Sequence, residues 1–386
     1  MSVQLFGIAQ NYAVLQEALL PNLMWDTLGA GSDPLLQIYP LGYEDASTIS
    51  YDQWEDPFGL TALRGLDAPP MIVTLPGLRT YQVAPGYYGN KTMIRESQIT
   101  QMRQPGTPNE PVRMRELMNY YMNYFLGMAA SRIRQTMADL LLTGTFTNTT
   151  TNATDGTSDG SQDHTYTIEN YRTLSPANDG NTGPSWNLDP VNATPINDML
   201  YWQNYLTLGT STSFGRDSKL ITQTSVINDL LKTTQIQQTY KDKYGASIMG
   251  PDGVAELISQ GFSLPKIEVY DEGYQPTLAD VQAQTLSTFT RFIPPGNLIW
   301  AGKRKDGQIP GGFKFTRNAA KVTDGFSGYP VTNVSSDIPN IGQGLVVNVF
   351  YNNRTPVSFD YEISFNACPV TYYWASTAGI SYEVAA

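Results

Sequence analysis

The chain has 386 residues, 41% of them hydrophobic and 15% charged, and its formal net charge is −11. This length allows about two or three domain-sized units, and no stretch approaches the roughly 18 uninterrupted apolar residues of a membrane-spanning helix. The acidic balance argues against broad affinity for nucleic acid, because lysine and arginine carry phosphate binding.

The N-terminal part of the chain divides into an acidic block and a basic block. Residues 1–63 contain eight acidic residues and no lysine or arginine, whereas residues 64–134 contain nine basic and four acidic residues. Complementary blocks suit a surface that meets other copies of the same chain, although a solvated acidic arm fits the charges equally well. The first residues lack the basic stretch of a signal peptide, so we expect a soluble protein of the cytoplasm.

Helical spacing of apolar residues predicts a short amphipathic helix over residues 7–20. Glycine and proline then interrupt residues 26–70 so often that we expect an arm that packs on another surface. Residues 71–98 are predicted to form a hairpin, with MIVTLP as one strand and two further runs on either side of Pro85-Gly86.

The strongest helix signal covers residues 109–142. Residues 107–110, Thr-Pro-Asn-Glu, have the form of a capping box, and apolar residues then recur at a spacing of four residues, with one step of three, from Met114 to Leu141. Gly144 suits the end of the helix. A helix of this length fits better as a rod packed across a sheet than as part of a small globule.

The rest of the chain is predicted to alternate between strands and helices. Residues 145–190 are rich in Thr, Asn and Gly and favour a long hairpin. An α/β unit of about 150 residues follows. Its expected helices are 194–206, one opened by Ser225, and 254–260, and its expected strands are 219–222, 266–272 and 297–302. The runs LVVNVFY, SFDYEISF and VTYYWAS are expected to be strands that return to pair with the hairpin before residue 194.

The residues needed for common catalytic and metal sites are scarce. One cysteine, Cys368, and one histidine, His164, cannot build a structural zinc site and leave little for Ser-His-Asp or Cys-His catalysis. We expect Cys368 to be a buried hydrophobe. The turn Asp155–Gly160 begins like a calcium loop, but Tyr166 stands where the bidentate glutamate belongs. We therefore predict no catalytic, cofactor-binding or metal-binding residue. A glycoside hydrolase that works with two carboxylates stays open as an alternative.

Four segments carry a resemblance to a known family. They are TYQVAPGYYGNKTMIRESQ before the long helix, RQTMADLLLTGTF at its exit, GPSWNLDPVNATPINDM with Trp186 and Asp189-Pro190, and FIPPGNLIWAG, matched near the end by NACPVTYYW. Their order and spacing resemble the Hong Kong 97 coat-protein fold of tailed phages and herpesviruses, and most of all the lambda-type capsid proteins of the capsid protein E family. The resemblance covers most of the chain from about residue 75 onward.

The resemblance implies an α+β fold with a definite division of the chain. Residues 1–42 would form an N-terminal arm and residues 43–98 an extended loop, the E-loop, that lies over a neighbouring subunit. Residues 99–190 and 345–386 would form the P-domain, with a spine helix at about 109–142. Residues 191–344 would form an inserted α/β A-domain.

The resemblance also implies a structural function. The chain would be a major capsid protein that assembles as hexamers and pentamers into an icosahedral shell around packaged double-stranded DNA. Its expected partners are other copies of itself, a separate scaffolding protein, a portal and a decoration protein, with no cofactor, no membrane and no sequence-specific contact to DNA. We expect it in the virion capsid, with assembly in the host cytoplasm. An encapsulin-like compartment is the main alternative reading.

The charge blocks lead to a hypothesis about contacts between subunits. The acidic stretch around residues 44–56 would face basic residues of a neighbour. The predicted contact residues are Glu44, Asp45, Asp52, Trp54, Glu55, Asp56, Arg79, Arg95 and Arg113.

Overall fold

The computed structural model describes residues 32–44, 46–54, 78–95, 114–149, 163–176, 184–208, 210–245, 250–275, 289–316, 345–352 and 358–382. The chain divides into two compact units, and each combines segments that are distant in sequence. Unit 1 holds Met1–Ser50, Gln82–Ile133 and Gly312–Val370, and unit 2 holds Tyr51–Tyr81, Arg134–Gly311 and Thr371–Ala386. The predicted helix at 7–20, the strand at 71–76 and the calcium-like turn at 155–160 lie outside the described residues.

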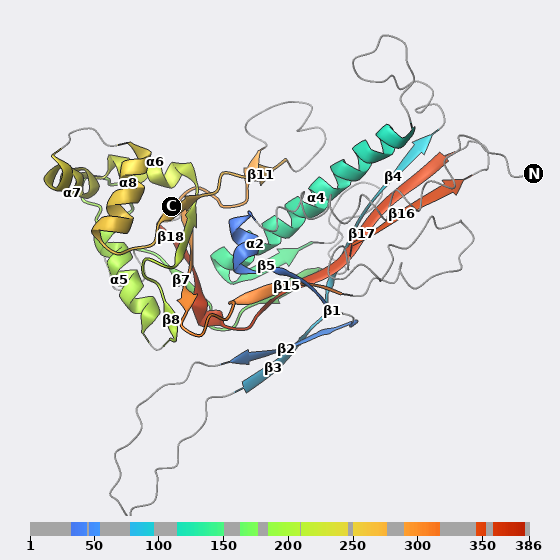
Figure 1. Ribbon diagram of the computed structural model, residues 1–386, viewed down its shortest axis with the longest axis horizontal. Coiled ribbons are helices and arrows are strands. Elements are labelled where there is room, and N and C mark those ends of the chain that lie inside the picture. Colours follow the sequence, from blue (N-terminus) through green and yellow to red (C-terminus); the bar gives the residue numbers. More distant parts are fainter. Residues whose placement is uncertain are drawn as a thin grey trace, which may run out of the picture. The chain divides into compact units, whose positions relative to one another are not determined.

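Unit 1 is built on a five-stranded sheet whose centre is a 14-residue strand, β17. This strand pairs antiparallel with β16 on one side and with β4 on the other, while β1 pairs parallel with β15. Figure 1 shows the first part of the long helix α4 running beside β4, β16 and β17. The elements of this unit are α2 (Pro34–Ile38), β1 (Leu41–Glu44), β4 (Gly86–Arg95), β15 (Gly311–Thr316), β16 (Leu345–Asn352) and β17 (Ser358–Thr371).

The short helix α2 lies within the stretch that we expected to be an arm. Asp33 accepts hydrogen bonds from the backbone N–H groups of Leu35 and Leu36, and Pro34 occupies the first turn, as at many helix starts. Leu35, Leu36 and Ile38 are buried, so part of the 26–70 segment belongs to the core of unit 1.

Residues 78–95 form two strands, as predicted, but not a hairpin. Strand β3 (Leu78–Val83) pairs with β2 (Ile49–Trp54), whereas β4 pairs with β17. The predicted pairing was therefore wrong. Ala84 precedes a proline, which favours extended backbone, so the chain continues past Pro85 instead of turning back.

Helix α4 (Met114–Thr143) confirms the long predicted helix over the residues that the structure describes. Phe125, Ala129, Ile133, Met137 and Leu141 are all buried, which is the four-residue rhythm read from the sequence. The helix ends at the predicted Gly144, whose φ of +74° is the left-handed conformation that glycine tolerates best.

Unit 2 contains a second five-stranded sheet in the order β10-β9-β13-β18-β7. The outer pairs β9–β10 and β7–β18 are parallel, and β13 is antiparallel to both of its neighbours. Figure 1 shows helices α5, α6, α7 and α8 gathered beside this sheet. The strands are β7 (Arg172–Leu174), β9 (Lys219–Thr222), β10 (Ile267–Val269), β13 (Asn297–Ala301) and β18 (Thr377–Ser381), and the helices are α5 (Pro195–Thr207), α6 (Thr224–Lys232), α7 (Thr234–Tyr244) and α8 (Pro251–Glu256).

Aromatic residues fill the core between this sheet and its helices. Trp186, Trp202 and Trp300 are fully buried, together with Leu220 and Leu230. Smaller paired strands complete the unit: β5 (Thr145–Asn148) with β6 (His164–Thr167), β8 (Thr212–Ser213) with β14 (Lys303–Arg304), and β11 (Gly273–Tyr274) with β12 (Thr290–Arg291). The β5–β6 pairing confirms the hairpin expected after α4.

The end of the chain departs from the predicted strands at one place. VTYYWAS was expected to be a strand, but Trp374–Ser376 form a 3-10 turn, and the strand that follows is β18. Strand β18 could not be predicted from alternating hydrophobicity, because its sequence TAGIS is short and made mostly of small residues. LVVNVFY and SFDYEISF are strands β16 and β17, as predicted, but they pair with each other and β17 also pairs with β4, so their expected pairing with the 145–190 segment was wrong. The strand that does pair with this segment is β18, which lies beside β7.

Candidate assembly surfaces

The β2–β3 ribbon carries three of the predicted contact residues, Asp52, Trp54 and Arg79. Tyr51 anchors it within unit 2: its ring stacks on Tyr81 at 5.6 Å, and its hydroxyl lies 2.7 Å from the hydroxyl of Tyr166. Tyr372 meets the same ring edge-on at 6.4 Å between ring centroids. Tyr51 and Tyr81 of the ribbon therefore form one cluster of buried or half-buried tyrosines with Tyr166 and Tyr372, which come from two other segments of unit 2.

Arg79 and Asp52 lie on this ribbon, and both are exposed and already engaged within the chain. Arg79 forms an ion pair with Glu169 at 3.0 Å, and the Tyr81 hydroxyl donates to the same carboxylate at 2.9 Å. Thr80 donates to Asp52 at 2.7 Å. Glu169 could not be predicted as the partner of Arg79, because the two residues lie about ninety positions apart and no local sequence pattern relates them.

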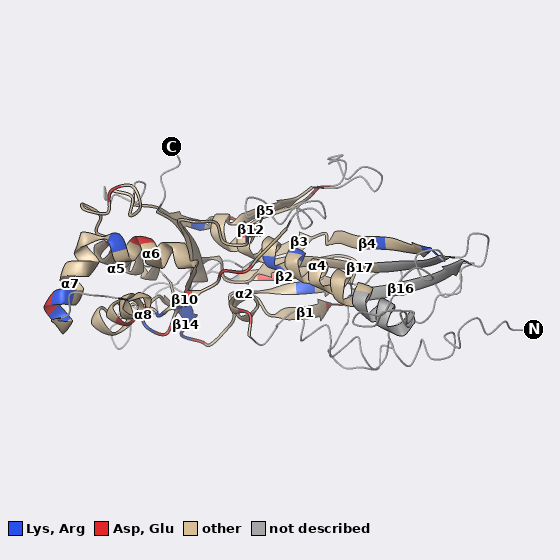
Figure 2. Ribbon diagram, turned by 90° about the horizontal axis from the view of Figure 1, so that it is seen from above, with Lys and Arg blue, Asp and Glu red and all other residues tan. Residues whose placement is uncertain are grey.

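Strand β4 presents a row of outward side chains that includes Arg95. Tyr87, Lys91, Met93 and Arg95 are exposed, and Tyr87 and Met93 are exposed by 73% and 47%. Figure 2 shows basic positions on β4 in blue and no acidic position in red. Within the described residues β4 pairs only with β17, so its other edge carries no strand. This row combines positive charge with apolar surface, which suits a partner that brings both acid and apolar groups.

The other predicted contact residues are less informative. Glu44 is half-buried at the end of β1, and Trp54 ends β2. Asp45, Glu55, Asp56 and Arg113 lie outside the described residues. Among the described members of the set, Arg79 pairs with Glu169 and Asp52 accepts from Thr80, so the predicted pairing between subunits stays a prediction.

The motif GPSWNLDPVNATPINDM ties the entrance of α5 to the end of the chain. The Trp186 ring nitrogen donates to the buried Asp198 carboxylate at 2.8 Å, and the Trp186 ring stacks on Tyr382 at 4.6 Å. Ser185 donates to the Tyr382 carbonyl at 2.6 Å, and the Tyr382 hydroxyl donates to Asp229 at 2.9 Å. The spacing of Trp186 and Asp198 in the motif thus lets the two side chains meet in the core of unit 2.

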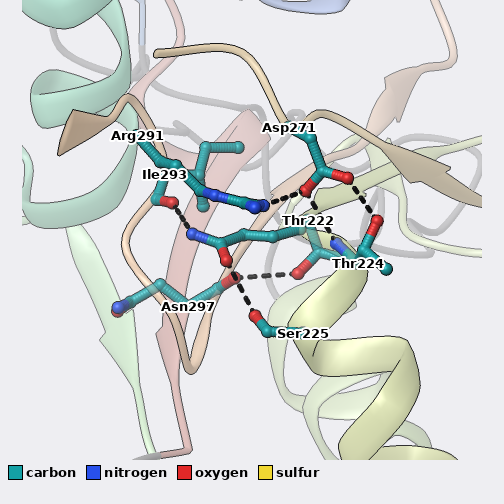
Figure 3. Close-up of polar contacts among 8 residues, drawn as sticks. Thr222, Thr224, Ser225, Asp271, Arg291, Ile293 and Asn297 are labelled. Atoms are coloured by element: carbon teal, nitrogen blue, oxygen red, sulfur yellow. Dashed lines mark hydrogen bonds and ion pairs between the residues drawn. The ribbon is translucent and has the colours of Figure 1, made fainter. Parts of the chain in front are cut away.

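A polar network fixes the root of the β11–β12 hairpin (Figure 3). Asp271, just after β10, accepts hydrogen bonds from the backbone N–H of Thr224 at 3.0 Å and from the Thr224 hydroxyl, at the start of α6. Arg291 of β12 pairs with the same carboxylate. Gln223 donates to the Ile293 carbonyl beyond the hairpin. These contacts attach both strands of the hairpin to the edge of the sheet where β9 and β10 end.

The same network gives the stability of unit 2 a pH dependence. Burial raises the pKa of the Asp271 carboxyl, but the hydrogen bonds from Thr224 and the charge of Arg291 outweigh it and hold this pKa below its ordinary value. The stabilisation is therefore complete above the ordinary carboxyl pKa and is lost as pH falls through the lowered one. We expect the difference in unfolding free energy between the native chain and Asp271→Asn to shrink as pH falls from about 5 to about 2. Denaturant titrations across this range check it, and a pH-independent difference would contradict it.

The described residues contain no group of three or more His, Cys, Asp or Glu side chains that could hold a metal ion. Cys368 is buried, as predicted, and burial raises the pKa of its thiol. No helix in the described part of the chain is long and apolar enough to cross a membrane.

Comparisons with known proteins agree with the architecture. The family model described as phage major capsid protein E matches residues 45–309. No curated protein matches the sequence. A protein assigned as the capsid protein of a prophage of E. coli CFT073 superposes with a TM-score of 0.53 at 12% identity, over 94% of this chain and 98% of that chain.

Two further solved structures are similar over most of their length. A phage-related protein from Bordetella bronchiseptica RB50 gives a TM-score of 0.47 at 10% identity, over 94% of this chain and 96% of that one. The capsid of Myoviridae phage XM1 gives 0.40 at 12% identity, over 88% and 89%.

Proposed function

Because the chain belongs to the phage major capsid protein E family, we infer that it is a structural major capsid protein that forms an icosahedral phage shell. The observation that carries this conclusion is the family match from residue 45 to 309, well over half of the chain. The α+β fold is Hong Kong 97-like, as predicted, and agrees with the likeness to the prophage protein. Family and fold point to a structural protein and not to an enzyme.

We propose the division of labour along the chain that the resemblance implied. Residues 1–42 act as an arm, residues 43–98 as the E-loop, residues 99–190 with 345–386 as the P-domain, and residues 191–344 as the A-domain. The anchored β2–β3 ribbon supports a rigid base within the E-loop, since Tyr51 stacks on Tyr81 and its hydroxyl is hydrogen-bonded to that of Tyr166. Strand β18 pairs with β13 and with β7, so it joins strands of both proposed domains.

The contacts between subunits are proposed to be partly electrostatic. The acidic 44–56 stretch of one copy meets basic side chains of the next, among them Arg79, Arg95 and Arg113. The exposed Lys91 and Arg95 on β4 support this, because no acidic side chain shares their outward row. Arg79 already pairs with Glu169 of its own chain. In the shell it would bind this carboxylate together with one from the neighbouring copy, or exchange the first for the second.

Reversing charge in the acidic stretch tests this pairing. In the triple variant Asp52→Lys, Glu55→Lys, Asp56→Lys we expect the assembled fraction to fall at least about tenfold, because repulsion is repeated at every contact in the shell. Sedimentation velocity measures the assembled fraction, and thermal unfolding of the unassembled chain measures the fold.

Two controls sharpen this experiment. Reversing Asp242, Asp252 and Glu256, three exposed acids on α7 and α8, changes net charge equally and should leave assembly close to normal. Adding Lys91→Glu and Arg95→Glu to the first triple variant should restore part of the assembly. Normal assembly of the first triple variant would show that the acidic stretch does not make the contact.

The remaining partners are proposed from the family. The shell would bind three separate proteins, a scaffolding protein, a portal and a decoration protein. It would enclose double-stranded DNA without sequence-specific contact. Assembly would take place in the host cytoplasm. The acidic net charge is compatible with an enclosed polyanion, because a shell need not bind its contents tightly.

A further inference from the structure

One end of the sheet in unit 2 brings together lysines that are far apart in the sequence. Strands β9 and β10 begin at this end and β13 ends there, because β9 is parallel to β10 and antiparallel to β13. Lys219 opens β9 in register with Ala301, the last residue of β13. Lys266 immediately precedes β10, whose first residue is in register with Leu220, so Lys266 and Lys219 come together at this end of the sheet.

The β8–β14 ribbon extends this end of the sheet. Strand β14 begins two residues after β13 ends, and both of its residues are basic and are blue in Figure 2. Lys303 and Lys305 are exposed, whereas Arg304 between them is buried. Arg216, in the turn after β8, is exposed as well. We call the five residues of this region the basic sheet end: Arg216, Lys219, Lys266, Lys303 and Lys305.

Two acidic residues lie within this region, and each is paired. Asp217 and Lys303, both exposed, form an ion pair at 3.8 Å, which solvent screens strongly. Asp306 pairs with the buried Arg304 at 2.7 Å, so its charge is offset by a residue outside the basic sheet end. The five basic residues and Arg304 therefore leave a local surplus of positive charge in a chain whose net charge is −11.

The opposite end of the same sheet is balanced in charge. Asp271 and Glu272 follow the end of β10, and each meets an arginine. Asp271 pairs with Arg291, and Glu272 pairs with Arg134 at 3.4 Å. The surplus of basic side chains is therefore particular to the end where β9 and β10 begin.

Aromatic residues of the core hold both turns of the basic sheet end. The Trp300 ring nitrogen donates to the Ser218 hydroxyl at 2.9 Å, in the turn that follows β8. The Arg304 guanidinium lies 3.5 Å from the centroid of the Tyr373 ring, in the turn that follows β14. Because the backbone under the lysines is fixed, a ligand that binds them orders only their flexible side chains.

We propose that the basic sheet end binds the phosphate backbone of double-stranded DNA, an inference that rests on the proposed function because DNA is the polyanion that such a shell encloses. Lysine and arginine bind phosphate oxygens without reading base sequence. The acidic net charge does not prevent a local contact, since exposed charges more than about 10 Å apart are largely screened at 0.1 M salt. The competing occupant is an acidic segment of another copy, and a measurement of assembly separates the two.

Removing three of these lysines tests the proposal. We expect the triple variant Lys266→Gln, Lys303→Gln, Lys305→Gln to bind a labelled DNA duplex of random sequence at least about tenfold more weakly than the native full-length chain at low salt. The slope of log affinity against log salt should flatten by about 2–3, because each phosphate contact contributes about 0.9 to it. Fluorescence anisotropy between about 50 and 200 mM salt measures both quantities.

A matched control separates this surface from net charge. The triple variant Lys232→Gln, Lys241→Gln, Lys243→Gln removes three exposed lysines of α6 and α7 and should weaken DNA binding by less than about twofold. Asp217→Asn should tighten binding by about two- to threefold, because it removes the acid beside Lys303. Equal losses in the two triple variants, or no binding by the native chain at low salt, would overturn the proposal.

Two further measurements cover misfolding and the competing occupant. In the native chain, DNA should slow acetylation of Lys266, Lys303 and Lys305, read by mass spectrometry, at least about fivefold more than that of Lys241 and Lys243, and uniform protection would overturn the proposal. Sedimentation velocity should show normal assembly of the first triple variant. Loss of assembly in that variant but not in the control would assign the basic sheet end to a contact between copies and overturn the proposal. Failure of the native chain to assemble would instead contradict the proposed function.

Discussion

Replacing Gly379 with alanine is expected to destabilise the chain by about 3 kcal/mol or more. A Cβ atom at this position would lie 1.8 Å from the carbonyl oxygen of Leu142, in the last turn of α4. Gly379 sits in β18 between β13 and β7, so the strand cannot move aside without breaking one of two pairings. The helix is fixed too, because Tyr171 donates to the Leu141 carbonyl at 2.5 Å. Denaturant unfolding of the unassembled chain measures the loss.

Gly127→Ala is the matched control for this substitution. Gly127 also lies in the described part of α4, but a Cβ atom there meets no atom within 4 Å. Alanine is the better helix former by about 0.5–1 kcal/mol, so this variant should be slightly more stable than the native chain. If the unfolding free energy of Gly379→Ala lies within about 1 kcal/mol of the native value, β18 does not pack as closely on α4 as described.

Trp186→Ala is expected to cost about 3–5 kcal/mol, because it empties a fully buried site in the core of unit 2. The same change removes a hydrogen bond to the buried Asp198 carboxylate and the stacking partner of Tyr382. Removing a donor from a buried acceptor adds about 1–3 kcal/mol to such a loss. The measurement is again the free energy of unfolding of the unassembled chain.

Phenylalanine variants separate the hydrogen bond from the packing. Trp202 is also fully buried, yet its ring nitrogen has no hydrogen-bond partner among the described residues. Trp186→Phe should therefore be more destabilising than Trp202→Phe by about 1 kcal/mol or more, since both lose similar volume and only the first loses a hydrogen bond. Equal losses in the two variants would mean that the bond to Asp198 contributes nothing to stability.

The sequence predicted the regular elements well where one residue pattern decides them. The four-residue rhythm of α4, its end at Gly144, and the helix after Thr194 are all present in the structure. These features depend on local spacing and on a single special residue. Periodicity, a proline in the first turn and a glycine at the C-terminal end report such features directly.

Long-range pairing could not be predicted in the same way. Nothing near Tyr88 indicates that its ring stacks on Phe365 at 5.0 Å, or that β4 pairs with β17 instead of β3. The contacts of Arg79 with Glu169 and of Asp271 with Arg291 depend on how strands are brought together across the fold. The charge blocks led to the hypothesis of a self-associating surface, which stays a prediction, and they do not specify which acidic residue would face which basic residue.

The most direct test of the central claim is negative-stain electron microscopy of the expressed chain, with its scaffolding protein where that is known. Proposed self-assembly predicts uniform hollow particles, or lattices of hexamers and pentamers, that sediment as megadalton species. A well-behaved monomer or dimer in the presence of the scaffold would contradict it.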